Sequence, residues 1–155
     1  MSSQVLRTQA GTSEAWLKFL RAHAALTREL SSRLEASHGL TLSDFDVLVQ
    51  LFHAGGNRLR RIDLARQVLL SASGITRLLD GLERAGWVEK AYCDSDGRVT
   101  YAQLTEAGMK KIAAARKTHH ADIEALFSAK FSADEITTLD ELLGRLPLAD
   151  TECAK

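Results

Sequence analysis

One break in an otherwise helical pattern constrains this chain more than any other feature of its sequence. Apolar residues recur every three or four positions along most of the chain, and proline occurs only once, at Pro147. Between Trp87 and Leu104 the period changes to two, on either side of the turn-forming run Asp94-Ser95-Asp96-Gly97. Alternation around such a turn is typical of a β-hairpin. The sequence therefore predicts a mainly α fold with one two-stranded β-hairpin placed among helices.

The first expected element is a long helix over residues 12–38. Thr12 or Ser13 can cap its start, and Gly39 stands where a left-handed residue would end it. One stripe of this helix carries residues at spacings of three and four, namely Trp16, Phe19, Leu20, His23, Leu26, Leu30 and Leu34. This spacing predicts one buried face along the helix.

Three shorter helices are expected next. Thr41 and Asp44 form an approximate capping box for the first, which ends at Gly55-Gly56-Asn57. The second covers residues 62–68, and the third covers residues 71–85. Three short helices followed by a hairpin make up a winged helix-turn-helix, which we place at residues 40–104 of a single domain spanning 1–155.

Two further helices follow the hairpin. Thr105 caps a long helix, and Ser132 with Glu135 forms a capping box for the last one, which Pro147 ends. The flanking helices, at 12–38 and 105–147, have apolar stripes that one chain does not obviously cover. A second copy of the chain is the simplest cover, so we expect a homodimer.

Composition excludes several classes of protein. The 155 residues are 45% hydrophobic and 26% charged, as in ordinary globular domains, and no apolar run approaches the ~18 residues that cross a bilayer. The segment Met1–Gly11 is polar and does not resemble a signal peptide. Two cysteines, Cys93 and Cys153, are too few for a disulfide framework. We therefore expect a cytoplasmic protein.

The helix expected over residues 71–85 divides into two parts. Its later leucines suit a core, whereas its first turns carry small, hydroxyl-bearing or cationic residues, among them Ser71, Ser73, Thr76 and Arg77. This division suits a recognition helix whose first turns enter the major groove of DNA. Hydroxyl groups bind phosphates or base edges, and arginine binds guanine or a phosphate. Taken alone, the same residues also suit a helix cap and an ordinary surface.

Three stretches resemble one known family. They are Leu70–Val88, the triplet Asp96-Gly97-Arg98, and Leu104–Gly108. They are similar to the recognition helix and first wing strand, the Asp-x-Arg wing signature, and the entry into the dimerisation helix of MarR-family transcriptional regulators. The resemblance covers nearly the whole chain in element order, and it is specific between residues 58 and 108.

The resemblance implies a symmetric dimer with each recognition helix in a major groove. Arg98 would reach an adjacent minor groove, and Asp96 would orient that arginine. Ala72 departs from many relatives, which carry a basic residue there, and this implies lower affinity or a different operator. Relatives often bind small aromatic or phenolic anions between the dimer helices and the DNA-binding lobe, so such an effector is a further candidate partner. Residues such as Trp16, His23, Phe45 and Phe52 suit a plain core as well as a ligand pocket.

Charge supports the DNA-binding hypothesis modestly. The whole chain is neutral, but residues 58–98 contain eight basic and six acidic residues, a surplus of two. In a dimer this surplus doubles and can form a basic stripe. We expect Arg58, Arg60 and Arg61 to contact phosphates; a solvated surface cluster is the alternative.

A metal site is less well supported. His119 and His120 lie near Asp122 and Glu124, but adjacent helical residues point about 100° apart. Peroxide-sensing relatives place a reactive cysteine near the start of the first long helix, where this chain has none. We expect no metal and no cofactor.

An enzyme is the least supported class. The sequence contains no glycine-rich phosphate loop and no Gly-x-Ser-x-Gly motif. The leading hypothesis is a ligand-responsive repressor that binds a pseudo-palindromic operator as a homodimer. Two alternatives stay open: a winged helix that binds another protein, and a metal- or redox-responsive regulator.

Overall fold

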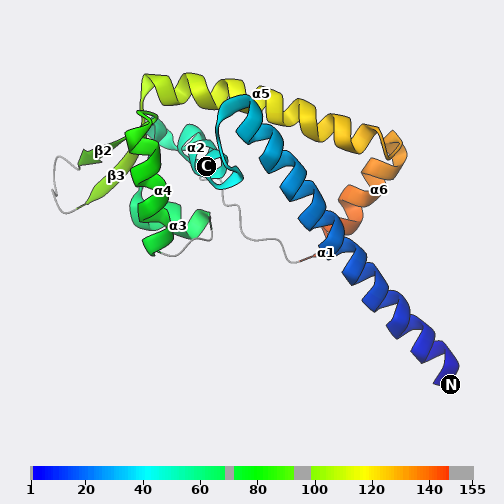
Figure 1. Cartoon of the computed structure of the whole chain (residues 1–155). Helices are drawn as coiled ribbons and strands as arrows, with labels where there is room; N and C mark the ends of the chain where they lie inside the picture. Colours follow the sequence, from blue (N-terminus) through cyan, green and yellow to red (C-terminus); the bar gives the residue numbers. More distant parts are fainter. Residues whose placement is uncertain (1, 69–71, 93–98, 147–155) are drawn as a thin grey trace.

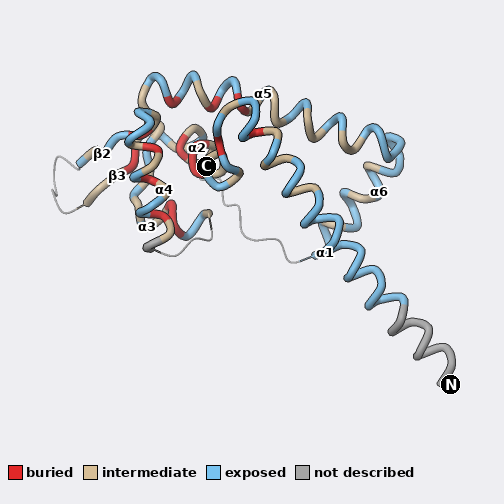
Figure 2. Tube along the Cα trace, in the orientation of Figure 1, coloured by how far each residue is buried: buried red, intermediate tan, exposed pale blue. Residues whose placement is uncertain are grey.

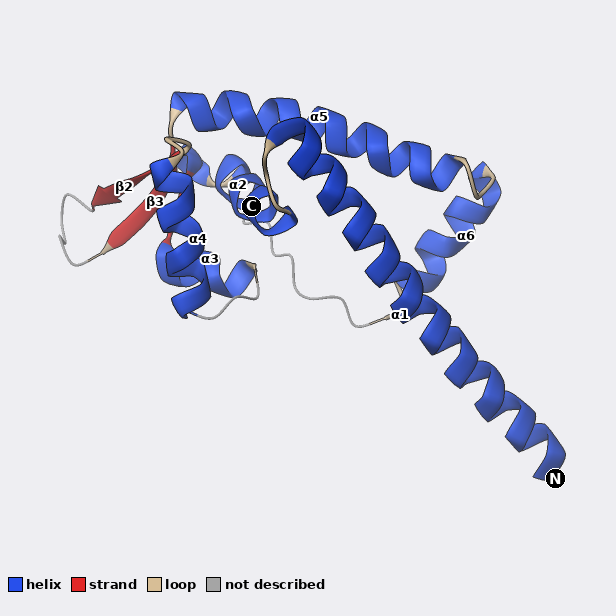
Figure 3. Ribbon diagram, viewed as in Figure 1, coloured by secondary structure: helices blue, strands red, loops and turns tan. Residues whose placement is uncertain are grey.

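The computed structural model describes residues 2–68, 72–92 and 99–146 (Figures 1 and 3). Side chains are described for 11–68, 74–92 and 99–146. Within these residues the elements, in chain order, are α1 (Ser2–His38), α2 (Leu42–His53), the 3-10 turn η1 (Gly55–Asn57), β1 (Arg58–Arg60), α3 (Arg61–Gln67), α4 (Ala72–Arg84), β2 (Val88–Tyr92), β3 (Thr100–Leu104), α5 (Glu106–Ser128) and α6 (Ala133–Leu143). This is the mainly α winged helix that the sequence predicts, with long helices before and after it.

Two parts of the molecule are visible in Figure 1. Helices α2, α3 and α4 gather with the small sheet at one end, and we call residues 42–104 the winged-helix lobe. Helix α5 leaves this lobe and runs to α6, and the C-terminal part of α1 packs against α5 and α2. Two side-chain contacts join α1 to α5: Arg33 Nη1 lies 3.0 Å from Asp122 Oδ1, and His38 Nε2 lies 2.9 Å from Thr118 Oγ1. The lobe is therefore anchored to both long helices.

The core lies inside the lobe and beneath the ends of α1 and α5. Its fully buried side chains come from α1 to α5 and include Leu34, Leu48, Leu51, Leu64, Leu79 and Ile112. Figure 2 shows that the buried residues concentrate here, whereas the described N-terminal half of α1 is exposed. Burial of apolar side chains at about 25 cal/mol per Å² makes this cluster the main source of stability.

The sheet has three antiparallel strands in the order β1-β3-β2. The hairpin β2–β3 is the predicted one, and β1 is a strand that the sequence did not reveal. Its residues are Arg-Leu-Arg, which are too few and too polar to show alternation. The strand forms because it pairs with β3. Leu59 lies opposite Ala102 of β3 and packs against the core.

The caps predicted at Thr41, Thr105, Ser132 and Gly39 are confirmed, whereas Thr12 and Ser13 lie inside α1 and do not cap it. The Thr41 hydroxyl accepts from the Asp44 backbone N–H at 3.1 Å, and the Asp44 carboxylate accepts from the Thr41 N–H at 2.9 Å. Ser132 and Glu135 make the same reciprocal pair, and Gly39 has the left-handed φ of +63°.

Two helix boundaries differ from the prediction. Helix α1 begins at Ser2 rather than near Thr12, because residues 2–11 contain no proline and only one glycine to interrupt a helix. Helix α6 ends at Leu143, where Gly144 is the C-cap, and Pro147 lies outside the described residues. None of the described helices is long and apolar enough to cross a membrane.

Candidate nucleic-acid interface

Helices α3 and α4 form the expected helix-turn-helix. Leu64 and Ala65 of α3 are buried, and α4 packs against α3. On α4 the buried residues are Ile75, Leu79 and Leu82, at the three- and four-residue spacing of one helical face. This face fixes α4 on the core and leaves its other side at the surface.

The exposed side of α4 carries two of the predicted DNA-binding residues. Thr76 and Arg77 are both exposed, and Arg77 lines a hollow of about 790 Å³ with Asp80, Glu83 and Arg84. Among the described residues Arg77 forms no ion pair. Its guanidinium group therefore has five N–H donors to offer a phosphate or a base edge.

Four predicted site residues cannot be placed as side chains. Ser71, Asp96 and Arg98 lie outside the described residues, together with the predicted hairpin turn at Asp94–Gly97. Ser73 lies within α4, but its side chain is outside the described set.

The side chains of Arg58, Arg60 and Arg61 make different contacts. Arg58 and Arg60 pair with Gln103 and Tyr101, on the face of the sheet opposite to Leu59 and its core contacts. On this outer face the Arg58 guanidinium carbon lies 5.1 Å from the centre of the Tyr101 ring. Arg58 is therefore held against the sheet by a cation–π contact.

Arg60 and Arg61 are each paired with an aspartate. Arg60 Nε donates to Asp63 Oδ2 at 2.5 Å, and this carboxylate raises the pKa of Arg60. The Arg61 side chain is only 25% exposed, and its Nη2 lies 4.0 Å from Asp80 Oδ1. Arg61 thus connects α3 to α4, whereas Arg58 and Arg60 lie on the sheet.

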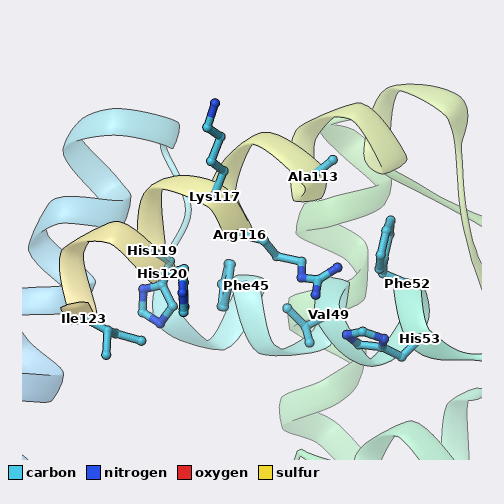
Figure 4. Close-up of a pocket in the computed structure, with 10 residues that line it drawn as sticks. All are labelled: Phe45, Val49, Phe52, His53, Ala113, Arg116, Lys117, His119, His120 and Ile123. Carbon is cyan, nitrogen blue, oxygen red and sulfur yellow. The ribbon is translucent and has the colours of Figure 1, made fainter. Parts of the chain in front are cut away.

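A cavity of about 540 Å³ is lined by residues of α2 and α5 (Figure 4). Its lining residues are Phe45, Val49, Phe52, His53, Ala113, Arg116, Lys117, His119, His120 and Ile123. The set combines apolar groups with cationic or titratable ones and contains no acidic residue. Such a lining suits a small apolar ligand that carries a negative charge.

Two aromatic contacts organise this cavity. The His119 ring lies 4.6 Å from the Phe45 ring, and the Arg116 guanidinium carbon lies 4.9 Å from the centre of the Phe52 ring. Burial lowers the pKa of His119, and nearby Asp122 opposes this shift. His119 Nδ1 is buried and has no hydrogen-bond partner among the described residues. The His119 ring thus lines the cavity, while its Nδ1 is covered by the protein.

Sequence reasoning found only part of this cavity. Phe45 and Phe52 line it, but Trp16 lies exposed on α1 and His23 is exposed as well. The run from Arg116 to His120 was visible in the sequence, but its histidines were considered as metal ligands, helix caps, dimer contacts or surface groups and not as the lining of a ligand cavity. No group of three or more metal-ligating side chains was found among the described residues.

Comparison with known proteins agrees with this architecture. The MarR family model matches residues 40–100. The HTH-type transcriptional regulator MhqR of Bacillus subtilis is 30% identical over 128 residues, which cover 83% of this chain and 86% of that protein. The chain belongs to the MarR family. Its members are transcriptional regulators, as the sequence motifs imply.

Two solved structures share the fold of this MarR-family protein. Sco3205 of Streptomyces coelicolor, a MarR-family regulator in complex with DNA, has a TM-score of 0.79 and 24% identity, over 87% of this chain and 84% of that one. An organohalide-sensing transcriptional regulator in its 2,4-dichlorophenol-bound form has a TM-score of 0.74 and 17% identity, over 93% of this chain and 86% of that one. Both likenesses show the fold.

Proposed function

We propose that this MarR-family protein is a cytoplasmic, sequence-specific transcriptional repressor that binds double-stranded DNA as a homodimer and is released by a small ligand. It acts by occupying DNA and not by catalysis. The observation that carries the proposal is the two-sided α4, whose Ile75, Leu79 and Leu82 are buried while Thr76 and Arg77 are exposed. A helix fixed in this way can present its first turns to the major groove.

In this proposal each part of the interface has a distinct role. Ser71, Ser73, Thr76 and Arg77 contact bases and phosphates in the major groove. Arg98 enters the minor groove and is oriented by Asp96. The remaining phosphate contacts come from Arg58, Arg60 and Arg61. Two-fold symmetry then requires a pseudo-palindromic operator with half-site centres about 10 bp apart.

Exposed apolar side chains support the homodimer. Trp16, Leu17 and Leu20 of α1 are 58%, 48% and 42% exposed, and Leu142 of α6 is 49% exposed. Large apolar side chains exposed on these helices favour an interface, and a second copy of the same helices is the cover we propose. Sedimentation velocity tests it: the wild type should sediment as a dimer, and Trp16→Glu with Leu20→Glu should yield monomers.

The cavity between α2 and α5 supports the release by a ligand. Because α2 belongs to the lobe and α5 leaves it, a molecule held between them can bias the angle of the lobe. A ligand that favours a wrongly spaced dimer weakens DNA binding by the same factor by which DNA weakens the ligand. The cationic lining of this cavity suits a small aromatic or phenolic anion.

A salt titration tests DNA binding directly. Purified protein is titrated against a fluorescent duplex from the region upstream of its own gene, with a scrambled duplex beside it. Tight, sequence-selective binding with a steep salt dependence supports the proposal. Weak binding that ignores sequence would contradict it and would favour a protein partner for the winged helix. Addition of 2,4-dichlorophenol or benzoate to the bound duplex then tests release.

A further inference from the structure

The turn that ends α4 is held by α5, and this junction assigns a role to Thr105. Gly86 has a left-handed φ of +75°. The Trp87 N–H donates to the Leu82 carbonyl at 3.0 Å, and the Gly86 N–H donates to the Glu83 carbonyl at 3.0 Å. These two bonds form a Schellman motif, which ends a helix in one defined geometry. The direction of α4 is therefore defined relative to the Gly86–Trp87 segment.

Thr105 connects that segment to the start of α5. Its hydroxyl donates to the Gly86 carbonyl at 2.6 Å and accepts from the Gly108 N–H at 3.0 Å. Its own N–H donates to the Trp87 carbonyl at 3.1 Å. One residue thus caps α5 and binds two consecutive carbonyls at the end of α4.

The first turns of α5 add two further contacts to Trp87. Gly108 lies so close that a Cβ at this position would be 2.0 Å from the Trp87 carbonyl oxygen. Lys111 Nζ lies 4.8 Å from the centre of the Trp87 ring. The backbone and the ring of Trp87 are therefore both held by α5.

A small change in the angle between α4 and α5 at this junction displaces the N-terminal end of α4 appreciably. Thr76 lies ten positions before Gly86 along the chain, which is about 15 Å of helix at 1.5 Å per residue. A tilt of about 10° at the junction moves that end of α4 by about 2.6 Å. This displacement approaches the ~3.4 Å rise of one base pair.

We infer that Thr105 is a positioning residue that fixes the angle between α4 and α5 and thereby sets the half-site spacing that the dimer accepts. The inference rests on the proposed homodimeric DNA binding. Thr105 need not touch DNA, since it acts through the carbonyls of Gly86 and Trp87. Removing its hydroxyl should loosen the spacing requirement more than it weakens binding to a single half-site.

The experiment compares duplexes that differ only in spacing. The wild-type protein first selects its best duplex from a random pool, and versions of this duplex are made with one base pair inserted or deleted between the half-sites. Affinities are measured for the wild type, Thr105→Val and Thr105→Ser. Thr41→Val is the matched control, because Thr41 also caps a helix but its hydroxyl, within the described part of the chain, bonds only to Asp44 of α2.

We expect the wild type, Thr105→Ser and Thr41→Val to prefer the selected spacing by about tenfold. We expect the preference of Thr105→Val to fall below about threefold. A preference in Thr105→Val equal to that of the wild type would overturn the inference, while the proposed function would stand. If the wild type selects no sequence, the proposed function itself fails. If Thr105→Val does not fold, Thr105→Ala decides, because it also lacks the hydroxyl that bonds to Gly86 and Gly108: a reduced preference supports the inference, and an unchanged one overturns it.

Discussion

Lys90 Nζ lies 3.3 Å from Glu83 Oε2, so the first strand of the hairpin, β2, is connected to α4. The Glu83 side chain is 20% exposed, and its other oxygen is buried without a hydrogen-bond partner among the described residues. A carboxylate in this position depends on its single cation. The pair therefore couples the orientation of the hairpin to that of α4.

A double-mutant cycle should detect this pair. Lys90→Met leaves Glu83 partly buried without its cation and should cost about 1–2 kcal/mol in the free energy of unfolding. Adding Glu83→Gln should recover part of that loss, with a coupling energy of about 1 kcal/mol. Urea unfolding of the four proteins gives the value. Strictly additive losses would mean that the ion pair contributes nothing to stability.

Gly108 and Gly81 should respond in opposite ways to the same substitution. A Cβ at Gly108 would meet the Trp87 carbonyl oxygen at 2.0 Å, whereas nothing lies within 4 Å of a Cβ at Gly81. We expect Gly108→Ala to destabilise the protein by about 2–3 kcal/mol or more, because backbone must shift. Gly81→Ala should stabilise it by about 0.5–1 kcal/mol, because alanine is the better helix former.

Chemical unfolding of these two glycine variants checks both directions at once. Equal effects of the two substitutions would show that α5 does not approach Trp87 closely. Since neither change adds charge, the comparison is independent of salt.

Features that depend on neighbouring residues could be predicted from the sequence. The pairs Thr41 with Asp44 and Ser132 with Glu135 lie three positions apart, so their geometry follows from helix formation alone. The two-sided pattern of α4 was visible for the same reason. The family resemblance then supplied the order of the elements.

Features that depend on distant residues could not be predicted. Strand β1 exists only because β3, about forty positions away, supplies its hydrogen bonds. The cavity joins Phe45 of α2 to His119 of α5, and no local pattern indicates that these rings meet. Likewise, Arg61 looked equivalent to Arg58 in the sequence, but it reaches toward Asp80 and is partly buried.

Acid should destabilise the protein partly through His119. Burial holds the pKa of its imidazole below the ordinary value, while in the unfolded chain the group binds a proton near pH 6.5. Between these two pKa values the unfolded state holds the additional proton, so stability falls as the pH drops through this window. Below the folded pKa the contribution levels off.

The variant His119→Gln should flatten this part of the stability profile, measured by urea unfolding between about pH 5 and 8. His120→Gln is the matched control, because His120 is the exposed neighbour on the same helix. A profile of His119→Gln that parallels the wild type would show that this imidazole is not held neutral by burial.

Arg77 should be distinguishable from Arg84 by the salt dependence of DNA binding. Both lie exposed on α4, but Arg84 is in its last turn and its Nε donates to the Asp80 carbonyl at 3.2 Å. If Arg77 contacts DNA, Arg77→Ala should weaken operator binding by about 1–3 kcal/mol and, for a phosphate contact, should lower the salt slope by about 1. Arg84→Ala should change neither quantity appreciably.

Relaxed preference at one base pair would instead identify Arg77 as a base-reading residue, because a lost phosphate contact weakens all sequences equally. Arg98→Ala should also lower the salt slope, and normal operator binding by both the Arg77 and Arg98 variants would remove these two arginines from the interface.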